Sequence, residues 1–193
     1  MTTQINKLAE ILDEMTKSGK SEVTQDEISD ILKETYRQIV ANSKFKSVFT
    51  KYVDTVRATI SDKWIEGEQR YNKKFTRENL GMLKIELQPC YYAGQNVGFE
   101  IKTEFDNEGY RGAFPVMMIV SDDSKGNLYV QYRMPPNTFT PFTPEGHKQI
   151  KKLLDGIFDI CWKTFVAELK KKKMVCEPIT KLSDGFEGKV IRQ

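Results

Sequence analysis

Side chains that most enzymes use for acid–base and nucleophilic chemistry are scarce in this sequence. Among the 193 residues there is one histidine, His147. A single imidazole removes most schemes in which a histidine base activates a serine or cysteine nucleophile. His147 falls in the first turn of an expected helix, where a capping or solvent-facing role is the ordinary one. We therefore identify no candidate catalytic residue.

Cysteine is also rare, with three residues at positions 90, 161 and 176. They form no CxxC pair and their number is odd, which argues against a disulfide framework or a zinc finger and suits a reducing compartment. Cys161 falls on the apolar stripe of the last expected helix, where a cysteine acts as a small core hydrophobe. The sequence predicts no metal site and no cofactor.

Glycine-rich loops that hold phosphate groups are missing. No segment matches GxxxxGK[ST], and no GxGxxG lies between an expected strand and helix. The acidic pair Asp122-Asp123 followed by Asn127 lacks the ligand spacing and terminal Glu of a calcium loop. These segments are predicted to be turns.

Long apolar runs are absent too, since none approaches the roughly 20 residues of a membrane span. Residues after Met1 are polar and helix-like, without the apolar core of a signal peptide. The expectation is a cytoplasmic protein, in the host cytoplasm if its origin is viral, with no membrane partner.

The charge balance is mildly basic, with a net charge of +3 and a pI near 8.6. A dedicated nucleic-acid binder usually has a pI above about 9. The chain has 23 Lys against 7 Arg and only 6 Ala. This bias is the basis of a hypothesis that the coding sequence is AT-rich, as in many phages and some bacteria.

The first third of the chain predicts three helices within residues 3–66. The first has a narrow apolar stripe, and the second begins with a capping box made by Thr24 and Glu27. The third keeps helical spacing of apolar residues from Phe45 to Trp64. A polar linker or frayed extension follows, up to Asn79.

From Leu80 the apolar period changes from 3.6 to 2, which is typical of strands with one dry and one wet face. Two such segments run over 83–87 and 97–105, and two further strands are expected over 114–120 and 128–134. The short loops between neighbouring strands predict an antiparallel meander of four strands. In the second segment, the predicted dry set consists of Val97, Phe99, Ile101, Thr103 and Phe105, which alternate with charged residues.

The last long helix is predicted to begin with Thr143 as N-cap and Pro144 at its first position, and to end at the lysines 170–173. Residues 174–193 predict a short strand or an arm. The fold class is therefore α+β: a helical segment over 1–79, packed on the rest, and a meander, covering helix and arm over 80–193.

Two sets of aromatic residues are candidate partner-binding positions. Tyr91-Tyr92 directly precede a predicted turn, and Phe139 and Phe142 lie in a segment stiffened by three prolines. The two phenylalanines either tuck under the sheet or contact a partner. Stiff aromatic side chains bind partners at low entropic cost.

Basic residues supply the alternative, a nucleic-acid-binding surface on and beside the last helix. Its candidates are Arg111, Arg133, Lys148, Lys151, Lys152, Lys170, Lys171, Lys172 and Lys173. Such binding weakens steeply with salt, because each neutralised phosphate releases counterions. The competing interpretation is that these lysines keep the helix soluble.

The leading hypothesis is a non-catalytic protein-interaction or assembly subunit of phage or bacterial type, binding a protein partner or a second copy of itself. Nucleic-acid binding is the alternative. A third hypothesis is an enzyme that uses acidic residues and tyrosines on the sheet. It requires a deep pocket of converging polar side chains.

Overall fold

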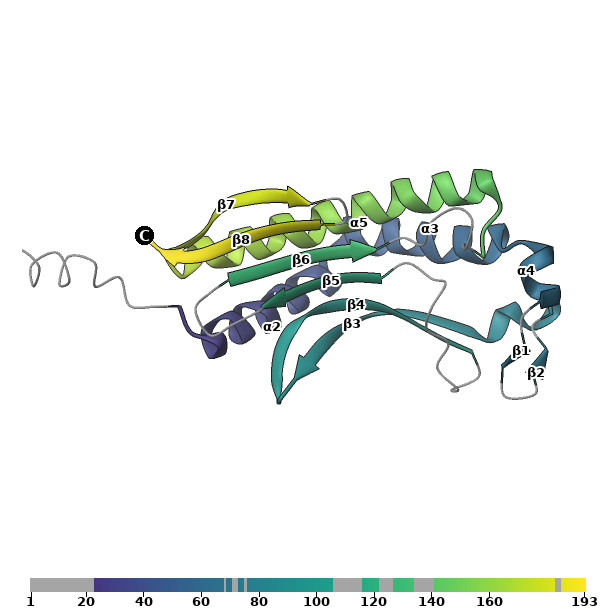
Figure 1. Ribbon diagram of the computed structural model, residues 1–193, viewed down its shortest axis with the longest axis horizontal. Helices are drawn as coiled ribbons and strands as arrows, with labels where there is room; N and C mark the ends of the chain where they lie inside the picture. Colours follow the sequence, from purple (N-terminus) through teal and green to yellow (C-terminus); the bar gives the residue numbers. More distant parts are fainter. Residues whose placement is uncertain are drawn as a thin grey trace, which may run out of the picture.

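The computed structural model describes residues 23–67, 69–70, 73–74, 76–105, 116–121, 127–133, 141–182 and 185–193. Within these ranges the protein combines helices with antiparallel sheets, as expected for the α+β class (Figure 1). The first predicted helix, over residues 3–18, lies outside the described residues, as do Arg111 and Phe139.

Helix α2 (Gln25–Ala41) begins as predicted. Thr24 Oγ1 accepts a hydrogen bond from Glu27 N at 3.3 Å, and Glu27 Oε2 accepts one from Thr24 N at 3.0 Å. This reciprocal pair satisfies two amides that the first helical turn leaves free. The helix buries Ile28, Ile31, Leu32 and Ile39. It ends at Asn42, whose side chain accepts from Phe45 N and so caps helix α3 (Ser43–Thr59).

The third predicted helix is shorter than expected. It stops at Thr59, because Ile60 is extended (φ −62°, ψ 128°) and forms an antiparallel bridge with Phe142. The amide of Ser61 donates to the Pro141 carbonyl at 2.6 Å, and that of Thr143 to the Thr59 carbonyl at 2.9 Å. A short helix, α4 (Asp62–Gly67), follows the break. Helical spacing continued through this point, but backbone pairing with a distant segment ended the helix.

The predicted polar linker contains local structure. Strands β1 (Gln69–Arg70) and β2 (Lys73–Lys74) pair with each other, and the 3-10 helix η1 (Glu78–Met82) leads into the first long strand.

The prediction of one four-stranded meander is wrong. Strands β3 (Leu83–Tyr92) and β4 (Gln95–Phe105) form an antiparallel pair of their own. Strands β5 (Val116–Ser121) and β6 (Asn127–Arg133) also pair, but in a sheet of order β5-β6-β8-β7. β4 lies beside β5, yet no hydrogen-bonded pairing joins them within the described ranges.

On the side away from β5, strand β6 pairs with a strand from the C-terminal arm. Strands β7 (Met174–Leu182) and β8 (Gly185–Arg192) form a hairpin, and β8 pairs with β6. The β7–β8 register shifts between Glu177 and Thr180, around Pro178, which has no amide to donate. The arm is therefore an integral part of the larger sheet.

Helix α5 (Pro144–Lys171) begins with the predicted Thr143 cap, which accepts from Gly146 N, and with proline in its first turn. Its 28 residues run antiparallel to α2 and α3 and contact both, as Figure 1 shows. The helix contacts the sheet at β7. The buried core joins α2, α3, α5 and the inner face of β3–β4, so residues of both predicted segments, 1–79 and 80–193, share it.

Candidate interaction site between helix α2 and the β3–β4 hairpin

Tyr91 and Tyr92 lie at the tip of the β3–β4 hairpin and are the most exposed large apolar side chains described, at 60% and 77%. The turn beyond them consists of Ala93 (φ 48°) and Gly94 (φ 80°). Two successive residues of positive φ match the twist of antiparallel strands and make a tight connection. The tight turn presents both tyrosines to solvent on a short, well-paired hairpin.

A β-bulge sets the direction of the residues next to the turn. Cys90 pairs with Gly98 and Tyr91 with Asn96, so Val97 is an extra residue on β4. A bulge changes which face successive side chains occupy. Asn96 consequently lies on the same face as Phe99 and Ile101, toward α2, and is fully buried, whereas Val97 is half-buried. The predicted dry set is therefore wrong at its first member, Val97, whereas Phe99, Ile101 and Thr103 are buried as predicted.

Asn96 is tied to both the bulge and the helix. Its backbone amide donates to Ser29 Oγ on α2 at 2.9 Å, and its Oδ1 accepts from Gly98 N at 2.9 Å. The remaining donor, Asn96 Nδ2, is buried and has no hydrogen-bond partner. A buried amide donor without a partner is costly and uncommon in folded proteins.

A hollow of about 490 Å³ lies between α2 and this end of the hairpin, and we call it the α2–hairpin hollow. Pro89, Tyr91 and Asn96 line it from the hairpin. Helix α2 contributes Asp30, Lys33, Glu34, Tyr36 and Arg37. Its volume falls within the range of small-ligand and peptide pockets.

The charges of the α2–hairpin hollow are largely neutralised within α2. Lys33 Nζ lies 3.0 Å from Asp30 Oδ1, and Arg37 Nη1 lies 3.2 Å from Glu34 Oε2. Gln38 also donates to Glu34, and this bond is the main cause of the lowered pKa of that carboxyl. The pairs leave the hollow without an excess of either sign.

Tyr36 forms part of the wall between α2 and β3. Its hydroxyl donates to the Leu87 carbonyl at 3.2 Å, and its ring stacks on Phe99 with centroids 6.0 Å apart. Burial, with a smaller contribution from the charge of Glu86, raises the pKa of the Tyr36 hydroxyl. Tyr36 is thus a neutral, fixed aromatic wall at neutral pH.

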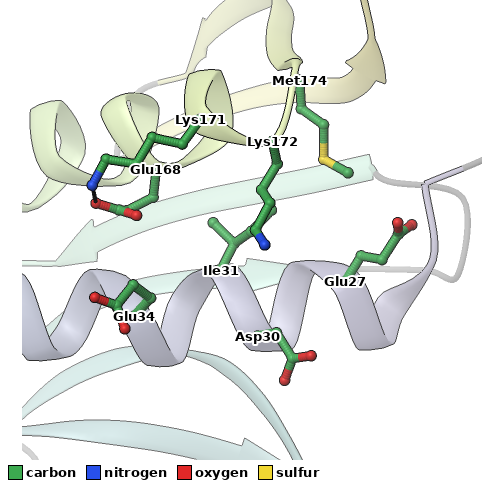
Figure 2. A pocket seen from close by; sticks show the side chains of 8 residues that line it. All are labelled: Glu27, Asp30, Ile31, Glu34, Glu168, Lys171, Lys172 and Met174. Carbon is green, nitrogen blue, oxygen red and sulfur yellow. Dashed lines mark hydrogen bonds and ion pairs between the residues drawn. The ribbon is translucent and has the colours of Figure 1, made fainter.

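A second hollow, of about 630 Å³, lies on the other side of α2 and shares Asp30 and Glu34 with the first. We call it the α2–α5 hollow. Figure 2 shows Ile31 on its α2 side, Met174 beyond the end of α5, and Lys172 extending toward Ile31. Lys171 Nζ is paired with Glu168 Oε1 at 2.6 Å. Glu27, at the start of α2, is paired with Arg192 of β8.

The predicted basic residues do not form one surface. Lys148, Lys151 and Lys152 are exposed at the start of α5, and the lysines 170–173 are exposed at its end, on the order of 30 Å away along the helix axis. Lys151 approaches Asp155 at 3.5 Å, and the second cluster borders the acids of the α2–α5 hollow. Arg133 ends β6, where only the backbone is described.

Phe142 is 3% exposed and belongs to the core, through the bridge that it forms with Ile60. Of the two alternatives for this residue, the structure shows the tucked one, so its assignment as a partner-binding residue is wrong. Phe139 stays an untested prediction.

Cys161 and Cys176 have the character of structural residues. Burial raises the pKa of the Cys161 thiol to about 12 and that of Cys176 to about 11, so neither forms a thiolate readily. Across the ranges that the structure describes, no three His, Cys, Asp or Glu side chains gather as metal ligands. No described helix has the length and apolarity needed to cross a membrane.

Comparison of the chain with protein-family models, curated proteins and solved structures finds no match. The site is therefore interpreted from its own residues. Sequence reasoning named Tyr91 and Tyr92 as candidates, but it assigned Asn96, which lines the hollow, to the turn. The sequence signal near Asn96 is Gly94 followed by two polar residues, which indicates a turn. It does not indicate the bulge that directs Asn96 toward α2.

Proposed function

We propose that this protein is a non-catalytic protein-interaction subunit that binds its partner with the tip of the β3–β4 hairpin. The observation that carries the proposal is the pair of exposed tyrosines beside the α2–hairpin hollow. Tyrosine is enriched at the energetic centres of protein interfaces, since its ring buries a large area and loses little entropy. A second copy of the chain is one partner that fits this proposal.

The charge distribution favours a protein over a polyanion. The lysine clusters at the two ends of α5 are far apart, and the C-terminal one borders Glu27, Asp30, Glu34 and Glu168. A nucleic-acid backbone would meet these carboxylates together with the lysines. Binding of nucleic acid therefore stays the alternative, with the lysines of α5 as its residues.

The test is affinity capture with the purified full chain as bait, comparing the wild type with a Tyr91→Ser/Tyr92→Ser double variant. A Met82→Ser variant is the matched control, because Met82 is also an exposed apolar side chain but lies in η1, away from the tip. We expect a protein that the wild type and the control capture and the double variant loses. Binding of that protein is then measured with both purified components.

Light scattering, with absorbance at 260 and 280 nm, measures the mass of the protein and any bound nucleic acid, and so tests the other possible partners. A dimer that the double variant converts to a monomer would identify the partner as a second copy. Capture that is equal for all three proteins would refute the hairpin-tip proposal. Nucleic acid that salt removes, and that is lost when the α5 lysines are replaced with glutamine, would support the alternative instead.

A further inference from the structure

The unpaired Asn96 amide indicates what kind of ligand the α2–hairpin hollow would accept. Asn96 is 0% exposed and lines this hollow, and its Nδ2 has no hydrogen-bond partner. If the side-chain oxygen and nitrogen of Asn96 were exchanged, the NH₂ group would face the donor Gly98 N. The 2.9 Å hydrogen bond from Gly98 N to Oδ1 would then be lost. The free group is therefore a donor, and its complement is an acceptor such as a carbonyl oxygen.

The apolar part of the hollow consists of rings. Tyr36 and Tyr91 provide aromatic surface from α2 and from β3, and Pro89, two positions before Tyr91 on β3, adds a third ring to the lining. The nearby charges Lys33–Asp30 and Arg37–Glu34 are already paired with each other. An uncharged segment with ring-shaped side chains suits such walls.

Other peptide conformations match this hollow less well. An α-helix uses its main-chain carbonyls internally, so none in its middle is free for Asn96. A strand added to β3 would find the Leu83 carbonyl bound by Arg57, the Leu87 carbonyl bound by Tyr36, and no amide at Pro89. A polyproline II segment has no internal hydrogen bonds, so its carbonyls are free, and such segments bind to aromatic-lined grooves.

We propose that the α2–hairpin hollow binds an extended, proline-containing peptide segment, one carbonyl of which accepts a hydrogen bond from Asn96 Nδ2. Tyr91 and Tyr36 contact the proline rings of that segment. This inference rests on the proposed protein-binding function and deepens it by naming the chemistry of the partner.

The experiment is a titration of the isotope-labelled full chain with a blocked proline decapeptide, followed by NMR. We expect the side-chain NH₂ signals of Asn96 to shift together with those of residues around Tyr91. A glycine–serine peptide of equal length is the probe control, and it should produce no such shifts, because a flexible chain must lose more entropy on binding.

Three variants locate the binding. Tyr91→Ala should weaken the proline peptide about tenfold, as expected for an aromatic contact residue. Met82→Ala is the matched control: this apolar side chain is also exposed, at 50%, but it lies in η1 and does not line the hollow. This variant should bind the peptide with unchanged affinity. Asn96→Asp keeps an acceptor for Gly98 N and removes the donor, so it should also weaken binding.

The outcomes separate this inference from the proposed function. Absence of peptide binding, or equal loss in the Tyr91 and Met82 variants, would overturn the inference, and partner capture that still requires the two tyrosines would leave the function standing. If Asn96→Asp does not fold, the Asn96 signals of the wild type decide: signals that stay unmoved at saturating peptide would refute the donor role.

Discussion

The two ends of the helical layer are built in different ways. At the closed end, which we define by Thr59, Ile60, Phe142 and Gly146, α3 and α5 touch through a glycine and are joined by backbone hydrogen bonds. At the open end, defined by Glu27–Arg37 with the end of α5 and the hairpin tip, α2 is flanked by a hollow on each side.

The difference contrasts a tightly packed region with one that contains hollows. At the closed end, α3 and α5 are in close contact, so an added methyl group is costly there. At the open end, polar side chains and the unpaired Asn96 donor surround the hollows, and this is where we propose that the binding surface lies. The two hollows differ as well: charge pairs characterise the α2–α5 hollow, whereas the α2–hairpin hollow adds a buried unpaired donor and aromatic walls.

The largest expected effect breaks the contact at the closed end. In Gly146→Ala the new Cβ would overlap the Cβ of Thr59 and lie 2.8 Å from its Oγ1. Overpacking of this kind should lower the free energy of unfolding by about 2 kcal/mol, as measured by urea denaturation.

The control for this change lies in the same helix. Gly156→Ala meets nothing closer than the Val48 Cγ1 at 3.8 Å, so higher helix propensity should raise the stability by about 0.5–1 kcal/mol. The same substitution would then have opposite signs at two positions of α5. A stable Gly146→Ala protein would show that the closed end can move apart.

The second prediction compares two tyrosines. Tyr52 is fully buried in α3 and its hydroxyl has no hydrogen-bond partner, while the Tyr36 hydroxyl donates to Leu87. Tyr52→Phe should raise the free energy of unfolding by about 1 kcal/mol, since it removes an unsatisfied polar group, and Tyr36→Phe should lower it by a similar amount. Changes of equal sign in thermal or urea unfolding would contradict the assignment of these two hydroxyls.

The third prediction concerns pH at the open end. The backbone hydrogen bond from Thr24, helped by Arg192, lowers the pKa of Glu27 from its usual 4.5. A carboxyl whose pKa is lowered on folding stabilises the protein above the usual value, and this contribution is lost as the pH falls below it. Glu27→Gln should therefore cost about 1 kcal/mol at pH 7 and progressively less below pH 4.5.

Thr24→Ala is the control for the pH effect. It removes the acceptor for Glu27 N, which does not titrate, so most of its loss of about 1 kcal/mol should persist at low pH. Only the weaker bond from the Thr24 hydroxyl to Glu27 Oε2, at 3.3 Å, depends on the carboxylate. Urea unfolding curves between pH 3 and pH 7 measure both variants. A Glu27→Gln deficit that is constant with pH would mean that the carboxylate charge is not what stabilises the cap.

The smallest expected effect is at the hairpin turn. Ala93 has a positive φ of 48°, which asparagine tolerates better than alanine, and Asn-Gly is a preferred pair for this turn. Ala93→Asn should raise the free energy of unfolding, measured by thermal denaturation, by about 0.5 kcal/mol, and the exposure of Tyr91 and Tyr92 should not change. Ala58→Asn, on an exposed face inside α3, should instead lower it by a similar amount.

Local rules predicted the parts of the fold that depend on neighbouring residues. The capping box of Thr24 and Glu27, the start of α5 at Thr143-Pro144 and the alternation in β3 were all confirmed. In each case the interacting groups are at most four residues apart, so their spacing carries the information. Tyr91 and Tyr92, which the sequence analysis named as candidate partner-binding residues, are exposed at the end of β3.

Where prediction failed, long-range pairing had overridden a local pattern. The helical spacing through Ile60 gave way to a bridge with Phe142. β6 pairs with β5 as predicted, but its other neighbour is β8, and β4 forms a separate sheet with β3. Pairing between segments this far apart depends on which edges meet when the core closes, and periodicity contains no record of that choice.

The sequence by itself determined the helix starts, the strand periods and the scarcity of catalytic groups. Only the tertiary structure decided that Phe142 is buried, that the C-terminal arm completes a sheet, and that Asn96 faces α2. The bulge at Val97 illustrates the reason: one extra residue reverses the face of its neighbours. The face that a side chain occupies is set by the register with a partner strand, which the chain acquires only on folding.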